Sequence, residues 1–108
     1  MAHFISLITY THQGSTQLGS TTKRAEAYEK RAEQLGVKII GTFWTLGKYD
    51  IVHILEAENE KMAAALAMST MALGNVRTHT LTAFTREEMT NDIIPNVQTA
   101  FDLLRVDP

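Results

Sequence analysis

The chain has 108 residues, with 10 Lys and Arg against 12 Asp and Glu, and no cysteine. This length predicts one domain. A net charge of −2 supplies no basic field, so nucleic acid is not an expected partner. The lack of cysteine excludes disulfides, thiol chemistry and Cys-ligated zinc. The apolar run 3–10 is too short for a signal peptide and lacks a basic start, so we expect a cytoplasmic protein without a membrane segment.

The first third of the chain predicts a strand, a loop and a helix. Residues 3–10 are β-branched or aromatic at most positions of both pleat faces, which predicts a central strand covered on both sides. Residues 11–20, rich in Gly, Ser and Thr, predict a loop. A helix is expected over 21–35, ended by Gly36. Its apolar stripe consists of Ala25, Tyr28, Ala32 and Leu35.

The middle of the chain predicts two strands, a second helix and a fourth strand. Residues 37–45 and 50–56 predict two strands of a hairpin, since only a short Gly-containing segment separates them. A second helix is expected over 59–73 and a fourth strand over 76–84. The order β-α-β-β-α-β predicts an α+β, ferredoxin-like fold, in which a four-stranded antiparallel sheet carries both helices on one face.

The C-terminal segment, residues 90–108, predicts a helical extension. Thr85 and Glu88 match a capping box, and apolar residues recur at helical spacing beyond it. Because proline is tolerated only in the first turn of a helix, Pro95 predicts a start near Asp92. We expect this extension to pack on its own or on a neighbouring subunit.

Self-association is predicted from two surfaces. No charged residue occurs between Met62 and Val76, so the helix from Asn59 to Leu73 lacks the charged face of an ordinary surface helix. The sheet face opposite the helices is also expected to be apolar and bare. These features predict a homo-oligomer, a dimer or higher, formed through the sheet face and this helix. The alternative is a monomer whose own C-terminal segment covers these surfaces.

The hairpin and the segment after the second helix resemble the GYD domain family. The residues that carry the resemblance are Phe43 to Asp50, Gly74 to Thr78 and Leu81 to Thr85. The likeness covers about residues 3–89, which makes 1–89 a ferredoxin-like GYD-type domain and 90–108 the extension. It implies a dimeric α/β-barrel type of assembly. It implies no reaction, because the family is one of unknown function.

The hairpin also supplies the first candidate ligand-binding residues. Tyr49 offers a phenol, Asp50 a carboxylate and Trp44 a flat apolar wall, and together they suit a small polar ligand. The structural alternative is that Asp50 accepts hydrogen bonds from loop amides while Tyr49 packs its ring.

Two histidines on strands are the next candidates. In the expected strand order 4-1-3-2, His53 and His79 lie on either side of the first strand and line one cavity if they point to the same face. A neutral imidazole in such a cavity serves as a general base or ligand contact. More commonly a strand histidine is a hydrogen-bonded core or interface residue.

Metal and anion sites have weaker support. The four histidines are dispersed and follow no ligand spacing, so no metal site and no cofactor are expected. Lys23 and Arg24 stand at the start of a helix, where cations oppose the helix dipole. A bound anion would explain them, although solvated surface charges are the commoner case.

Two functions fit these observations. The first is a homo-oligomeric module, small-ligand-binding or structural and regulatory, without a catalytic set. The second is a small-molecule enzyme of the dimeric α/β-barrel kind, a cofactor-independent oxygenase or isomerase that uses His53, Tyr49 and Asp50. An enzyme requires these side chains to converge on a cavity of roughly 300 Å³ or more.

Overall fold

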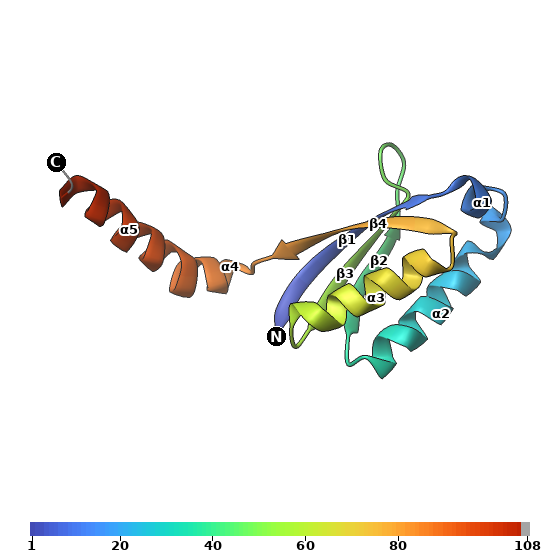
Figure 1. The fold of residues 1–108 in the computed structure, drawn as a ribbon, viewed down its shortest axis with the longest axis horizontal. Coiled ribbons are helices and arrows are strands. Elements are labelled where there is room, and N and C mark those ends of the chain that lie inside the picture. The colour runs from blue at the N-terminus through green and yellow to red at the C-terminus, as the bar shows by residue number, and fades with distance from the viewer. Residues whose placement is uncertain (107–108) are drawn as a thin grey trace.

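The computed structural model describes residues 1–106. Four antiparallel strands form one sheet in the order β2-β3-β1-β4, and two long helices cover one of its faces (Figure 1). The α+β, ferredoxin-like prediction and its strand order are confirmed. The elements are β1 (Ala2–Tyr10), α2 (Thr21–Gln34), β2 (Lys38–Trp44), β3 (Ile51–Ala57), α3 (Glu60–Ala72) and β4 (Val76–Ala83).

Alternation along the strands decides which side chains reach the helices. Successive side chains of a strand point to opposite faces, and directly paired residues share a face. On β3, every second residue from Ile51 to Ala57 is buried against the helices. β1 contributes Phe4, Ser6 and Ile8 to the same face. The intervening residues of both strands face the other side of the sheet.

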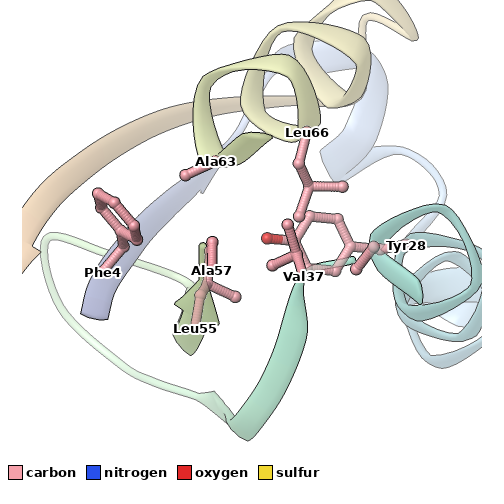
Figure 2. Packing of buried hydrophobic residues seen from close by; sticks show 8 residues of the cluster. Phe4, Tyr28, Val37, Leu55, Ala57, Ala63 and Leu66 are labelled. Carbon is pink, nitrogen blue, oxygen red and sulfur yellow. The ribbon is translucent and has the colours of Figure 1, made fainter. Parts of the chain in front are cut away.

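The hydrophobic core lies between the sheet and the two helices (Figure 2). Small residues of α2 and α3, Ala32 and Ala63, are buried there and let the helices approach the strands closely. Leu66 of α3 and Tyr28 of α2 fill the space between the helices and the sheet. The cluster consists of Phe4, Tyr28, Ala32, Val37, Leu55, Ala57, Ala63 and Leu66.

Both long helices end at the predicted glycines. Gly36 has φ of 72° and Gly74 has φ of 81°, a left-handed conformation that favours glycine and terminates a helix. At the start of α3, the side chain of Asn59 accepts a hydrogen bond from the Met62 amide at 3.2 Å. The boundaries of both helices therefore lie within a residue or two of those predicted.

The segment expected to be a loop is more ordered than predicted. It contains the short helix α1 (His12–Ser15) and the 3-10 turn η1 (Leu18–Ser20). Thr11 holds this segment, because its hydroxyl accepts from the Gly14 amide at 3.1 Å and donates to the Gly74 carbonyl at 2.6 Å. The second of these contacts comes from a residue far along the chain, so local composition did not predict it.

Gly14 makes a close contact that gives a first testable prediction. A Cβ on Gly14 would stand 1.9 Å from the Asn75 carbonyl oxygen, whereas a Cβ on Gly19 would meet nothing within 4 Å. Gly14→Ala is therefore expected to lower the free energy of unfolding by about 1–3 kcal/mol, the usual cost of overpacking. Urea unfolding followed by circular dichroism measures this. Gly19→Ala is the matched control, and an equal loss in both variants would contradict the steric explanation.

The chain after β4 is helical from Arg86 to Val106, through α4 (Arg86–Glu88), the π-helical η2 (Met89–Ile93) and α5 (Ile94–Val106). The predicted capping box is confirmed: the Thr85 hydroxyl and the Glu88 carboxylate bond each other's backbone amides at 3.1 and 3.0 Å. The predicted start near Asp92 lies two residues from Ile94, where α5 begins, and Pro95 is in its first turn as expected. The π turn η2 directly precedes Pro95. Because proline has no backbone N–H, it cannot donate the usual hydrogen bond of an α-helix, and the wider π turn lets the helical run continue into α5.

The helical run from α4 to α5 projects from the end of β4 and does not fold back over the sheet (Figure 1). The radius of gyration is 17.6 Å, whereas a compact chain of this length has about 13 Å. Apolar side chains of α5 are left exposed: Ile94, Val97, Phe101, Leu103 and Leu104. No helix of the described residues is both long enough and apolar enough to cross a bilayer.

Candidate functional site

A cavity of about 140 Å³ lies between α2, α3 and the helix-covered face of the sheet. Its apolar lining residues come from both helices and from the sheet: Ile8, Ala25, Ala27, Ile51, Leu73 and Val76. Its polar lining residues are Tyr10, Thr21, Arg24, Arg31, Thr70 and Asn75. Two stacked rings, those of Tyr28 and His53, complete it. We call this space the helix–sheet cavity.

The two rings form an uncharged aromatic wall. Their centroids lie 4.3 Å apart with an interplanar angle of 18°. The Nδ1 atom of His53 lies 2.9 Å from the Thr42 hydroxyl on the neighbouring strand. Burial lowers the pKa of His53 to about 4, so the imidazole is neutral at pH 7. Burial also raises the pKa of the Tyr28 phenol, which therefore stays protonated.

The predicted hairpin residues lie beside the helix–sheet cavity and do not line it. The Trp44 indole donates to the Thr21 hydroxyl at 3.1 Å, and that hydroxyl lies 2.8 Å from the Tyr10 phenol. The Asp50 carboxylate accepts from the Tyr10 backbone amide at 2.8 Å. Trp44 and Asp50 therefore position lining residues. The structural alternative named loop amides as the partners of Asp50, whereas the amide that it binds belongs to β1.

Tyr49 stays in the hairpin itself. It is half-buried, and the Lys48 ammonium lies 5.7 Å from the centre of its ring. The Thr45 hydroxyl donates to the Tyr49 carbonyl at 2.6 Å, which closes the turn. Its phenol is thus not part of the helix–sheet cavity.

The two candidate histidines lie on opposite faces of the sheet. His53 pairs with Ser6 of β1, whereas His79 pairs with Leu7, one residue further along the same strand. Because neighbouring residues of β1 point to opposite faces, His53 faces the helices and His79 faces the bare side. The condition for a shared cavity is not met, and His79 is exposed.

The enzyme hypothesis requires His53, Tyr49 and Asp50 to converge on one cavity. His53, Tyr49 and Asp50 do not converge, since only His53 lines the helix–sheet cavity. The cavity volume of about 140 Å³ is also below the roughly 300 Å³ of ordinary substrate pockets. Within residues 1–106, no three His, Asp or Glu side chains come together as a metal site.

Sequence reasoning missed several lining residues. Tyr10 and Asn75 stand at strand ends, and Arg31 stands beside the apolar stripe of α2. The available signal was the spacing of Arg24, Tyr28 and Arg31, which places all three on one side of that helix. The two arginines were not connected with the cavity because the sheet register decides what lies beneath the helix.

The bare face of the sheet carries a continuous apolar surface. Two adjacent rows of cross-strand partners run over all four strands on this side, and they carry apolar side chains except at Gly41 and His79. Phe43 and Leu81 are 57% and 49% exposed, and the side chains between them are half-buried. We call this surface the sheet patch, which consists of Ile5, Leu7, Phe43, Val52, Ile54 and Leu81.

These features define a ferredoxin-like α+β domain with a small cavity under its helices and an unpartnered apolar sheet face. The profile described as GYD domain matches residues 4–93. The chain belongs to the GYD domain family.

A curated relative comes from Thermus thermophilus and is called "Glutamine synthetase and cystathionine beta-lyase binding protein". It is 32% identical over 84 residues, which cover 77% of this chain and 88% of the relative.

Two solved structures share the fold. The crystal structure of TTHA0845 from Thermus thermophilus has a TM-score of 0.50 and 22% identity, over 79% of this chain and 95% of that chain. The solution structure of the C-terminal domain of the MgtC protein from Mycobacterium tuberculosis has a TM-score of 0.51 and 15% identity, over 76% of this chain and 86% of that chain. At these identities the likeness concerns the fold alone.

Proposed function

We propose that this protein is a homo-oligomeric binding and regulatory module, in which copies associate through their sheet patches. The observation that carries the proposal is the sheet patch itself. It lies at the middle of a four-stranded sheet whose other face is covered by helices. A contiguous apolar surface of this kind is normally buried in an interface.

The surroundings of the sheet patch fit an interface. Toward one end of the strands it is bordered by Lys38, Glu56 and His3, which are partners in one cross-strand row. Toward the other end it is bordered by Thr9 and Arg77, also cross-strand partners. An apolar centre with a polar rim is the usual composition of a protein–protein interface.

Two further surfaces extend the assembly. The outer side of α3 has no charge beyond Lys61, and its Met68 is 66% exposed. The apolar side of α5 lies beyond the sheet, where its own domain does not cover it (Figure 1). We propose that both pack against neighbouring copies, α5 as an arm of the 90–108 extension.

The assembled module is proposed to bind and regulate another protein rather than to catalyse a reaction. The name of the Thermus relative describes binding to two enzymes, and this chain covers most of that relative. The separation of His53 from Tyr49 and Asp50, which leaves the helix–sheet cavity without the expected acid–base set, supports the same conclusion.

Solution mass tests the self-association. Light scattering coupled to size-exclusion chromatography is expected to give at least twice the chain mass of 12.1 kDa. Leu81→Glu places a charge in the sheet patch and is expected to reduce this mass by half or more, because burying an unpaired charge is costly. Leu46→Glu is the matched control, since Leu46 lies in the exposed hairpin. A wild-type species with the mass of a single chain at micromolar concentration would refute the proposal.

A further inference from the structure

The helix–sheet cavity has a charge imbalance that the fold does not explain. Two arginines of α2, Arg24 and Arg31, line it, and no Asp or Glu is among the lining residues. Neither arginine forms an ion pair within residues 1–106. With His53 neutral at pH 7, the two guanidinium groups set the charge of the site. A cavity lined in this way attracts an anion.

The Arg31 guanidinium has hydrogen-bond partners for only part of its donors. Its Nη2 donates to the Thr70 hydroxyl at 3.2 Å, and its buried Nε has no hydrogen-bond partner. Its guanidinium also lies 5.9 Å from the centre of the Tyr28 ring. A buried charged donor without a partner is costly, and a carboxylate is the group that best satisfies a guanidinium.

Arg24 is held differently. Its Nη1 donates to the Gln17 carbonyl at 3.0 Å and to the Ser20 hydroxyl at 2.9 Å. These bonds are to neutral acceptors, so the charge of Arg24 is positioned by the η1 turn without being neutralised. Arg31 is therefore the expected direct contact, and Arg24 adds to the attraction at the same cavity.

The rest of the lining favours an organic anion over an inorganic one. Six aliphatic side chains line the cavity, and the Tyr28–His53 stack offers a flat aromatic surface. The volume of about 140 Å³ is close to the roughly 150 Å³ of an apolar cavity that takes benzene. A phosphate or sulfate ion would leave these apolar walls without a contact.

We propose that the helix–sheet cavity binds a small monocarboxylate with a compact apolar body, its carboxylate on Arg31 and its body against the Tyr28 ring. This inference does not depend on self-association, because every lining residue belongs to one copy.

Calorimetric titration of the full chain tests this site, with benzoate as the probe. Benzamide has the same shape without the charge, and it is expected to bind at least tenfold more weakly. Arg31→Met keeps an apolar stem, removes the guanidinium and is expected to weaken benzoate binding about ten- to a hundredfold. Arg86→Met is the matched control, because Arg86 lies in α4 and does not line the cavity, and it is expected to leave binding unchanged.

A second variant keeps the test decisive if Arg31→Met does not fold. Ala25→Leu fills part of the helix–sheet cavity from α2 and is expected to abolish binding of benzoate and benzamide alike. The proposal is overturned if benzoate does not bind at millimolar concentration, if benzamide binds equally well, or if inorganic phosphate binds more tightly. Solution mass measured on the same samples distinguishes these failures from a failure of self-association.

Discussion

Leu66→Ala is expected to lower the free energy of unfolding by about 2–5 kcal/mol, the usual cost of removing a large buried aliphatic side chain. Leu66 is 0% exposed and belongs to the core cluster. It reaches from α3 toward the sheet beside Tyr28 (Figure 2). Its removal leaves a void between helix and sheet that fixed strands cannot close. Urea unfolding at constant protein concentration measures the loss.

The matched control is the same substitution at a solvent-exposed site. Leu46 in the hairpin is fully exposed, so Leu46→Ala removes no buried contact. It is expected to change stability by no more than about 0.5 kcal/mol. Similar losses in the two variants would mean that α3 does not pack on the sheet as described.

The parts of the fold that could be predicted depend on local chemistry. Gly36 and Gly74 end the helices because their backbone conformation is one that other residues avoid. Thr85 and Glu88 bond each other's amides through a motif of four consecutive residues. The two buried residues of α2, Tyr28 and Ala32, belong to its predicted stripe. Each of these features needs only neighbours along the chain.

The parts that could not be predicted depend on register between distant strands. His53 and His79 each lie within a predicted strand, and only their pairing with Ser6 and Leu7 separates their faces. A shift of one residue in either pairing would have placed them together. The helix–sheet cavity is of the same kind, because Arg31 and Asn75 meet there through packing of α2 against the sheet.

The packing of the C-terminal extension could not be predicted from the sequence either. Its apolar spacing predicts a helix, but not where the apolar side packs. The structure places α5 beyond the end of β4, with Phe101 and Leu104 exposed. An apolar helix in that position has no covering partner among the described residues of its own domain, which is why the proposed assembly assigns it to a neighbouring copy.

The free energy of unfolding is expected to fall by about 3 kcal/mol between pH 7 and pH 4 through His53 alone, since each unit of pKa difference is worth about 1.4 kcal/mol. His53 is 2% exposed, and burial lowers its pKa from 6.5 to about 4. Between these two values the unfolded chain binds the proton that the folded chain excludes. The contribution is therefore complete above pH 6.5 and is lost as the pH falls toward 4.

Comparison with a non-titrating variant isolates this contribution from that of the carboxylates. His53→Asn keeps a polar group near the Thr42 hydroxyl and cannot be protonated in this range. It is expected to be less stable than the wild type at pH 7, because it leaves space beside Tyr28, and to lose much less stability between about pH 6.5 and 4.5. Parallel stability curves for the two proteins over that window would show that His53 is open to water. The stacked imidazole would then not be the neutral wall on which the electrostatics of the cavity depend.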